Sequence, residues 1–287
     1  MELETNSSQR TSEPEPHILY VVGTPIGNLK DISERGKSIL SKVSLIACED
    51  TRRTKKLLNA LKIKNKLFSF NEYNSKDKTD LIIKKLKEGS SVALVSDAGL
   101  PGISDPGEYL INTARKNNLD VICSPGPCAA LTGLVSSGLS CKYFSFIGFV
   151  PKKGSERENC FKMISENDFT IILYESPKRI KLLLKDLNKY CEGERIVHIA
   201  KELTKKYETH WNGSINKIAS EIGEIEHKGE FTIIIEGKRK TNKSYELNLT
   251  DLKKDLDELI KLGLKRALAA NYLAKKNGIP KNIIYNL

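Results

Sequence analysis

The stretch His17-Ile-Leu-Tyr-Val-Val-Gly-Thr-Pro-Ile-Gly-Asn-Leu29 decides the fold. An unbroken apolar run fills its first half and ends at Gly23. A strand with one face in solvent alternates apolar and polar side chains, whereas a continuous run is typical of a strand buried on both faces of a parallel sheet. The stretch therefore predicts a central strand that leads into a loop rich in glycine and proline.

The same pattern recurs outward from this stretch. In the first half we expect strands at residues 44–48, 66–70, 91–95, 120–123 and 144–149, and helices at residues 31–43, 51–61, 79–88, 108–117 and 128–137. In the second half we expect helices at 156–166 and 177–190, and strands at 169–174, 195–200, 206–211 and 231–236. Alternation of this kind predicts an α/β fold with right-handed crossovers.

Composition divides the chain into four predicted parts. These are a disordered tail (residues 1–16), two α/β domains (residues 17–125 and 126–238), and a basic linker with a small helical unit (residues 239–287). In the last part, Leu273-Ala274, Gly278, Ile279 and Ile284 follow the spacing of a helix-turn-helix. A simple helical hairpin packed on the main body explains the same spacing, so both interpretations stay open.

Composition also limits the class of protein. With 39% apolar and 29% charged residues, the chain is not a disordered one. It has no apolar stretch near the roughly 20 residues of a membrane helix and no signal-peptide pattern at its start, so we expect a soluble cytoplasmic protein. Six scattered cysteines predict reduced thiols, and Cys123 and Cys128 lack the surrounding histidines that would favour a metal site.

The charge is concentrated toward the end of the chain. The formal net charge is +11, and residues 238–287 alone hold twelve basic and five acidic side chains. Such a segment attracts polyanions, which makes nucleic acid a candidate partner. A lysine-rich solvated surface would give the same composition.

Four loops rich in glycine or proline directly follow predicted strands, at residues 23–29, 97–107, 124–127 and 175–177. Ligands of open α/β sheets bind beyond the carboxyl ends of strands, so these loops are expected to line one site. Dinucleotide and phosphate-loop glycine patterns are absent, as are the zinc-protease and serine-hydrolase motifs. Asp97 and Asp105 in the longest loop favour a ligand with hydroxyl groups and a positive centre.

Seven segments, in this order and spacing, closely resemble the RsmI family of 16S ribosomal RNA (cytidine-2′-O)-methyltransferases, within the tetrapyrrole methylase superfamily. They are VVGTPIGNLKDISERG, IACEDTRRTKKLL, ALVSDAGLPGISDPG, SPGPCAALTGL, LYESPKRI, AKELTKKYE and GEFTIIIEG. The resemblance covers residues 18–237, and the basic helical end resembles the C-terminal extension of the family. It implies a tetrapyrrole-methylase-like fold of two α/β domains with mixed sheets, a homodimer and no metal.

The resemblance also implies S-adenosyl-L-methionine as cofactor, bound in the cleft between the two domains. The positions that match its binding residues are Pro25, Asp97, Gly99, Ile103, Ser104, Cys128, Ala129, Tyr174, Ala200 and Thr204. Each of these would also serve as a turn or core residue. Cys128 stands where a serine is more usual, which leaves a backbone contact there but puts a side-chain contact in doubt.

Transfer to a ribose 2′-oxygen needs a base, and the candidates are Glu49 and Glu72, which both follow predicted strand ends. A structural role explains the acidic residues of the segment CEDTRRT equally well, with Asp50 capping the following helix and Glu49 pairing with Arg52. Contact with 16S rRNA in the small ribosomal subunit is expected from Arg52, Arg53, Lys178, Arg179, Lys205 and Lys206.

Two other functions stay open. One is carbon methylation of a tetrapyrrole ring, although the first loop reads GTPIGN where glycines would alternate, and an acidic small substrate needs no basic tail. The other is a non-catalytic RNA-binding assembly factor.

Overall fold

The computed structural model describes residues 13–73, 75–221, 228–238, 249–277 and 279–287. The chain forms two compact units, one ending at Lys238 and one beginning at Arg239. The predicted tail lies outside the described residues except for its last four, and so does most of the predicted linker. In the part of the chain that is described, no helix has the length and apolar character needed to cross a membrane.

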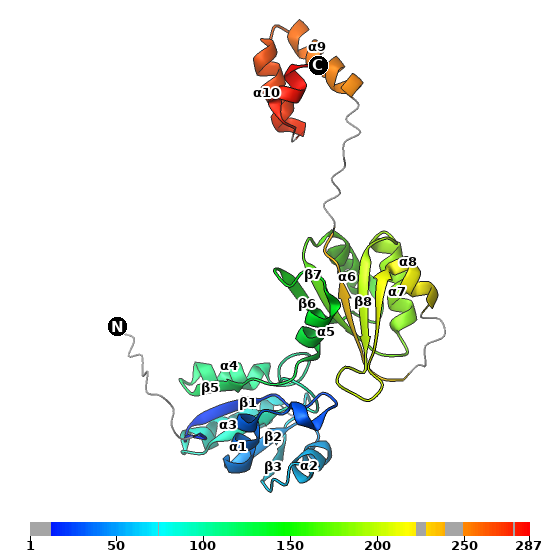
Figure 1. The fold of residues 1–287 in the computed structure, drawn as a ribbon. Helices are drawn as coiled ribbons and strands as arrows, with labels where there is room; N and C mark the ends of the chain where they lie inside the picture. Colours follow the sequence, from blue (N-terminus) through cyan, green and yellow to red (C-terminus); the bar gives the residue numbers. More distant parts are fainter. Residues whose placement is uncertain (1–12, 74, 222–227, 239–248, 278) are drawn as a thin grey trace. The chain divides into compact units, whose positions relative to one another are not determined.

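The first sheet of the larger unit is parallel throughout (Figure 1), with the strand order β3-β2-β4-β1-β5. The predicted central strand is β1, which lies between β4 and β5. All five strands fall within two residues of their expected positions. Their bounds are β1 (Ile18–Val22), β2 (Leu45–Cys48), β3 (Leu67–Ser69), β4 (Val92–Val95) and β5 (Asp120–Ser124).

Helices cover both faces of this sheet, which explains the continuous apolar run of β1. Tyr20 lies in the same core as Ile39 of α1, while its neighbour Leu19 lies in the core of the opposite face with Leu110 of α4. Successive side chains of a strand point to opposite faces, so every residue of β1 needs an apolar side chain. The helices are α1 (Glu34–Lys42), α2 (Thr51–Ala60), α3 (Ser75–Lys87) and α4 (Glu108–Lys116).

The second sheet is mixed, with the order β6-β7-β10-β8-β9. Its last strand in sequence, β10, is central and pairs antiparallel with both β7 and β8. β9 begins three residues later than predicted, and α8 (Ile215–Glu221) was not predicted. The strands are β6 (Phe144–Phe149), β7 (Thr170–Glu175), β8 (Ile196–Lys201), β9 (Thr209–Ser214) and β10 (Phe231–Ile235).

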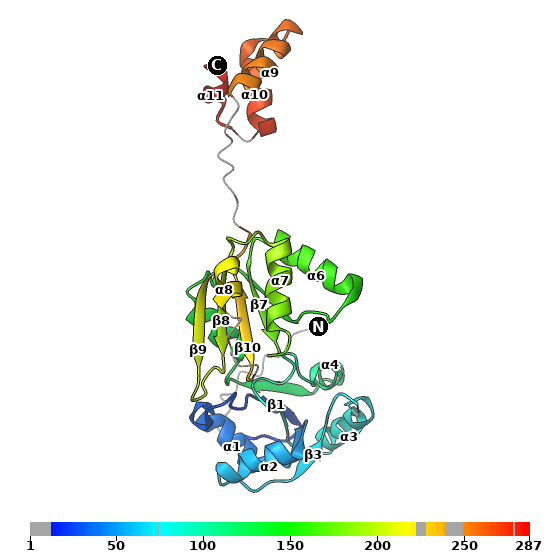
Figure 2. The ribbon, with the colours of Figure 1, turned by 90° about the vertical axis from the view of Figure 1, so that its right-hand side faces the viewer.

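The second sheet is also covered on both faces. Figure 2 shows the helices α6, α7 and α8 that cover one of them. One face packs against α6, α7 and α8 through a large apolar core that includes Phe161, Leu184 and Ile218. The opposite face carries Ile172 and Ile234, which pack against α5. The helices are α5 (Ala129–Ser137), α6 (Gly154–Glu166) and α7 (Ile180–Tyr190).

Three loops at the carboxyl ends of adjacent strands β4, β1 and β5 are fastened to one another. The Thr24 amide donates to the Gly99 carbonyl at 2.8 Å, and the Gly99 amide donates back to the Thr24 carbonyl at 3.1 Å. A Cβ atom on Gly126 would lie 2.8 Å from the Cα of Gly23, so only glycines allow these two loops to approach so closely. The fastened loops fix the positions of the residues that follow each strand.

The smaller unit consists of α9 (Leu249–Lys261), α10 (Arg266–Asn277) and α11 (Lys281–Tyr285). Leu273, Ala274, Ile279 and Ile284 are buried together, as the helix-turn-helix spacing predicts. Pro280 is the N-cap residue of the last helix. This unit therefore has an apolar core of its own.

Candidate functional site

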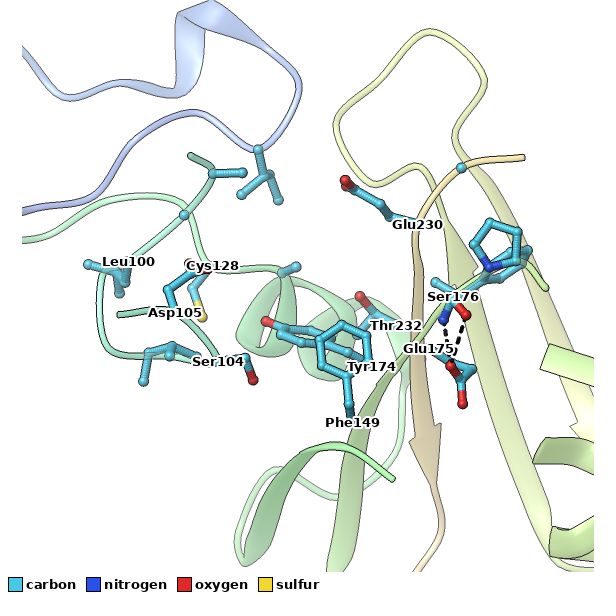
Figure 3. A pocket seen from close by; sticks show the side chains of 18 residues that line it. Leu100, Ser104, Asp105, Cys128, Phe149, Tyr174, Glu175, Ser176, Glu230 and Thr232 are labelled. Carbon is cyan, nitrogen blue, oxygen red and sulfur yellow. Dashed lines mark hydrogen bonds between the residues drawn. The ribbon is translucent and has the colours of Figure 1, made fainter. Parts of the chain in front are cut away.

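An apolar cavity of about 300 Å³ lies between the fastened loops of the first sheet and the strand ends of the second (Figure 3). The loops of the first sheet contribute Ile26 after β1 and the segment from Ala98 to Asp105 after β4, and Cys128 and Ala129 at the start of α5 line the cavity between the two sheets. The second half contributes Phe149, the segment from Tyr174 to Pro177, and the segment from Gly229 to Thr232. The two halves of the larger unit thus share one binding cavity, whose volume lies at the lower end of the usual range for small-molecule sites.

Six of the ten predicted cofactor residues line this cavity. The Tyr174 hydroxyl accepts a hydrogen bond from the Ala130 amide at 2.9 Å, which ties the end of β7 to the first turn of α5. Figure 3 shows Tyr174 and Phe149 together on one side and Asp105 beside Cys128 on the other. The six are Gly99, Ile103, Ser104, Cys128, Ala129 and Tyr174.

The other four predicted cofactor residues lie behind or beside the cavity wall. Ala200 is fully buried and packs with Ile26, so it supports the wall. The Thr204 hydroxyl oxygen is buried, and the described residues offer it no hydrogen-bond partner. Pro25 precedes the lining residue Ile26, and Asp97 faces a second cavity.

Sequence reasoning missed the part of the wall that surrounds the start of β10 and the end of β6. Phe149 stacks edge-on against Tyr174, with ring centroids 5.8 Å apart, and Thr232 is buried beside them. The one available signal was the segment GEFT (residues 229–232), which belongs to a segment that resembles the family but lacks the run of glycines and prolines that marks the predicted binding loops. Its role depends on the central position of β10, which the sequence does not reveal.

A second, polar cavity of about 530 Å³ collects both predicted bases and two predicted RNA-binding residues. Glu49, Arg52 and Arg53 come from the end of β2 and the start of α2, and Glu72 comes from the loop after β3. Asp97 lines this cavity, while its neighbours Ala98 and Gly99 line the apolar one. The two cavities therefore adjoin at this segment.

Hydrogen bonds hold the charged side chains of the polar cavity in place. Asp50 caps α2 by accepting from the Arg52 amide at 2.8 Å, as expected, and the Arg52 guanidinium lowers the pKa of Asp50. Asp97 accepts from the Asp50 amide at 3.2 Å and forms an ion pair with Arg53, also at 3.2 Å. Both arginines thus have one acidic partner and keep most of their surface exposed.

Glu49 differs from Glu72 in its surroundings. Glu49 is half-buried, and burial together with the charge of Asp97 raises its pKa. Its expected partner Arg52 is paired with Asp50 instead. Glu72 is exposed to solvent. A base whose pKa lies above the ordinary carboxylate value accepts a proton more readily, so the geometry favours Glu49 over Glu72.

The apolar cavity contains a carboxyl group, that of Asp105, whose pKa is raised further than that of Glu49. Burial, followed by the charge of Glu49, raises the pKa of Asp105 to about 6, and a hydrogen bond with Ser96 offsets this only in part. Burial also raises the pKa of the Tyr174 phenol, which keeps it protonated at neutral pH. Strongly shifted groups are enriched at functional sites, because burial that is unfavourable for folding is retained there.

The remaining predicted RNA-binding residues fall into two groups. Lys178 and Lys206 are exposed, and the Lys206 ammonium lies 5.4 Å from the ring centroid of Tyr207. Arg179 donates to the Val150 carbonyl at 2.6 Å, and Lys205 forms ion pairs with Glu202 and Glu230. The side chains of Arg179 and Lys205 are therefore already engaged in contacts within the protein.

The chain belongs to the family of tetrapyrrole (corrin/porphyrin) methylases, whose model matches residues 18–219. Among solved structures it is similar to diphthine synthase, with a TM-score of 0.58, 12% identity and coverage of 76% of this chain and 90% of that one. It is also similar to uroporphyrin-III C-methyltransferase from Thermus thermophilus complexed with S-adenosyl homocysteine, with a TM-score of 0.53, 14% identity and coverage of 75% and 96%. At such identities, the likeness concerns the fold.

Curated relatives within the family carry the name ribosomal RNA small subunit methyltransferase I. The protein from Haemophilus influenzae is 40% identical over 93% of this chain and 95% of its own length. The protein from Halalkalibacterium halodurans is 41% identical over 94% and 93%. The protein from Thermotoga maritima is 41% identical over 220 residues, which make up 77% of this chain and 98% of that relative. The last relative is therefore shorter than this chain.

The shifted pKa of Asp105 predicts that Asp105→Asn stabilises the larger unit at high pH. Because the unfolded carboxyl ionises at a lower pH than the folded one, the wild type loses stability as pH rises toward and through about 6, and the variant does not. We expect the variant to melt at least about 2 °C higher at pH 8, the shift that roughly 1 kcal/mol gives a domain of this size.

Calorimetric or fluorescence melting curves from pH 4 to pH 8 would measure this difference. Glu108→Gln is the matched control, since Glu108 is exposed and lies three residues away at the start of α4. A melting difference that stayed the same across the pH range would contradict the prediction.

Proposed function

We propose that this chain transfers a methyl group from S-adenosyl-L-methionine to the ribose 2′-oxygen of a cytidine in the decoding region of 16S rRNA. The observation that carries the proposal is the pair of adjoining cavities, one apolar, the other polar, more open and lined by two arginines. The names of the curated relatives supply the substrate class, because they describe methyltransferases of small-subunit ribosomal RNA.

The apolar cavity fits the methyl donor. Its aromatic pair Phe149 and Tyr174 offers a surface for a flat base, and Gly99, which lines the cavity without a side chain, packs closely against Ile26. The donor supplies a methyl group on a positively charged sulfur, which is already activated for displacement. Gly99, Ile103, Ser104, Cys128, Ala129 and Tyr174 would hold it, with Pro25, Asp97, Ala200 and Thr204 as further predicted contributors.

The polar cavity fits the acceptor. A ribose in it would have its phosphates within reach of Arg52 and Arg53, whose planar guanidinium groups bind phosphate through two hydrogen bonds. Asp97 lines the polar cavity and Ala98 and Gly99 line the apolar one, so an acceptor and a donor bound in these cavities would lie side by side. Fixing both reactants in this way can supply about 7–11 kcal/mol of the barrier.

Glu49 is the proposed base. It lines the acceptor cavity, and burial and the charge of Asp97 raise its affinity for a proton. When the ribose oxygen attacks, its hydroxyl proton passes to this carboxylate. Asp97, held by Arg53 and the Asp50 amide, keeps the neighbouring charges in position.

Contact with the ribosomal subunit extends beyond the cavity. We propose that Lys178 and Lys206 add phosphate contacts, with Arg179 and Lys205 mainly positioning the loops that carry them. The basic smaller unit, with Lys265, Lys275 and Lys276, would contact rRNA as well. A cytoplasmic homodimer completes the proposal, by resemblance to the family.

Methyl transfer to small subunits from a strain that lacks this activity tests the proposed function directly. With labelled S-adenosyl-L-methionine, we expect label in 16S rRNA, and a ribose-methylation map should gain one site at a decoding-region cytidine. Label that appeared on a porphyrinoid and never on rRNA would favour tetrapyrrole methylation. Failure of the donor to bind at millimolar concentration would favour a non-catalytic assembly factor.

Glu49→Gln should lower kcat by about 10²–10⁴-fold, the usual contribution of a general base, and leave donor affinity unchanged. Glu72→Gln is the matched control, because Glu72 lines the same cavity with an exposed carboxylate, and it should change kcat far less. Single-turnover transfer to small subunits separates chemistry from product release. Equal losses in the two variants would remove Glu49 from the base role.

Truncation after Lys238 should weaken subunit binding and make it less sensitive to salt, because fewer lysines then displace counterions from the rRNA. The truncated chain should still bind S-adenosyl-L-methionine, since the described donor cavity lies entirely in the larger unit. Filter binding to small subunits at several salt concentrations measures both effects. An unchanged slope of affinity against salt would show that the smaller unit does not contact RNA.

A further inference from the structure

Three acidic residues line the apolar cavity, and they differ in their partners. Glu175 is buried, is paired with Arg179, and turns toward the Ser176 amide, from which it accepts at 2.7 Å (Figure 3). Glu230 is mostly exposed and is paired with Lys205. For Asp105, the described residues include no basic side chain within ion-pair distance. Asp105 is therefore the unpaired acid of this wall in the described chain.

The groups around Asp105 do not compensate its negative charge. Glu49 and Asp97, after the neighbouring strands β2 and β4, are both acidic and both raise its pKa. Across the cavity stands Tyr174, whose raised pKa keeps its phenol neutral. The nearby cation Arg53 is already paired with Asp97. With a pKa of about 6, the Asp105 carboxyl is mostly ionised at neutral pH, and the wall does not neutralise it.

An uncompensated carboxylate in an apolar cavity is unfavourable until a cation enters. A cationic ligand in this cavity would interact with it strongly, because the surroundings screen charge less than water does. A neutral ligand of the same shape would gain nothing from it. The carboxylate therefore gives the cavity a means of distinguishing two ligands that differ in charge alone.

We propose that Asp105 is the residue by which this cavity binds the positively charged methyl donor in preference to its neutral product. The inference rests on the proposed function, since it takes S-adenosyl-L-methionine as the donor. It goes beyond that function by assigning a specificity-determining role to a side chain outside the set of predicted cofactor residues.

The reaction itself removes the attraction. The ribose oxygen forms a bond to the methyl carbon, the carbon–sulfur bond breaks with its electron pair on sulfur, and the hydroxyl proton passes to the base. Sulfur thereby changes from a sulfonium cation to a neutral thioether. Asp105 is then again without a partner, so its ionised form no longer favours the bound ligand, and S-adenosyl-L-homocysteine leaves more readily.

The same coupling predicts a pH dependence of binding. A cation stabilises the ionised form of Asp105, so donor binding should strengthen as pH rises from 5 to 7.5, with a midpoint near the pKa of about 6. The product should lack this component. Donor and product share their adenosine, amino and carboxylate groups, so the ratio of their dissociation constants cancels the titration of those groups and isolates the sulfonium charge.

Calorimetric titration of the full chain with S-adenosyl-L-methionine and S-adenosyl-L-homocysteine, at pH 5 to 8, tests the proposal. The wild type should increasingly favour the donor as pH rises. In Asp105→Asn the ratio should be flat and, at pH 7.5, lower on the order of tenfold, the effect of one pKa unit of coupling between two charges. Product affinity should change less than about twofold. Glu108→Gln, which removes an exposed charge nearby, should behave as the wild type.

Proton release gives a second measurement that a merely structural role would not affect. At pH 6, titrations in two buffers of different ionisation enthalpy should show the wild type releasing a fraction of a proton on binding the donor, beyond any release on binding the product. Asp105→Asn should show no such excess. The proposal would be overturned if the ratio of the two dissociation constants changed neither with pH nor on substitution of Asp105. It would also be overturned if the substitution weakened the binding of donor and product equally. Absence of binding by either ligand to the wild type would instead overturn the proposed function, and the inference with it.

Discussion

The two backbone hydrogen bonds between Thr24 and Gly99, and the contact of Gly23 with Gly126 beside them, are the constraint on which the site depends. They join the loops that leave three adjacent parallel strands. Loops on a protein surface are ordinarily the most variable part of a fold, but here each loop is held by its neighbours. The cavity-lining residues that follow these strands, among them Ile26, Gly99 and Ala129, are thereby fixed relative to one another without any contribution from a ligand.

Fixed loops allow one sheet edge to support two different environments. On one side of Asp97 the wall is charged and open, and on the other side, from Ala98 onward, it is apolar and faces the strand ends of the second sheet. A donor and an acceptor of opposite chemical character can therefore lie close together without sharing a pocket. Charges interact more strongly beside apolar walls than in the open, polar cavity, and this difference underlies the role proposed for the single unpaired carboxylate, that of Asp105.

The local part of this arrangement could be predicted from the sequence. The apolar run before Gly23 indicated a doubly covered strand, and the predicted loops after β1, β4 and β7 line one cavity, as expected. The fourth predicted loop, residues 124–127, does not line it and ends directly before the lining residue Cys128. The contribution of Phe149 and Thr232 could not be predicted. It depends on β10 lying between β7 and β8, and neither periodicity nor composition encodes which strands become neighbours. The distinction between Glu49 and Glu72 likewise depends on burial, which two glutamates after strand ends do not reveal.

The central place of β10 also affects the order in which the chain can fold during synthesis. All five strands of the first sheet are made by Ser124, so this half can form while the rest is still being translated. The second sheet must wait for Phe231–Ile235, and until then β7 and β8 have no strand between them and expose apolar edges. A nascent or prematurely terminated chain that ends before this strand thus has an incomplete second sheet with exposed apolar edges, which chaperones and proteases can recognise. The first sheet of the same chain is by then complete.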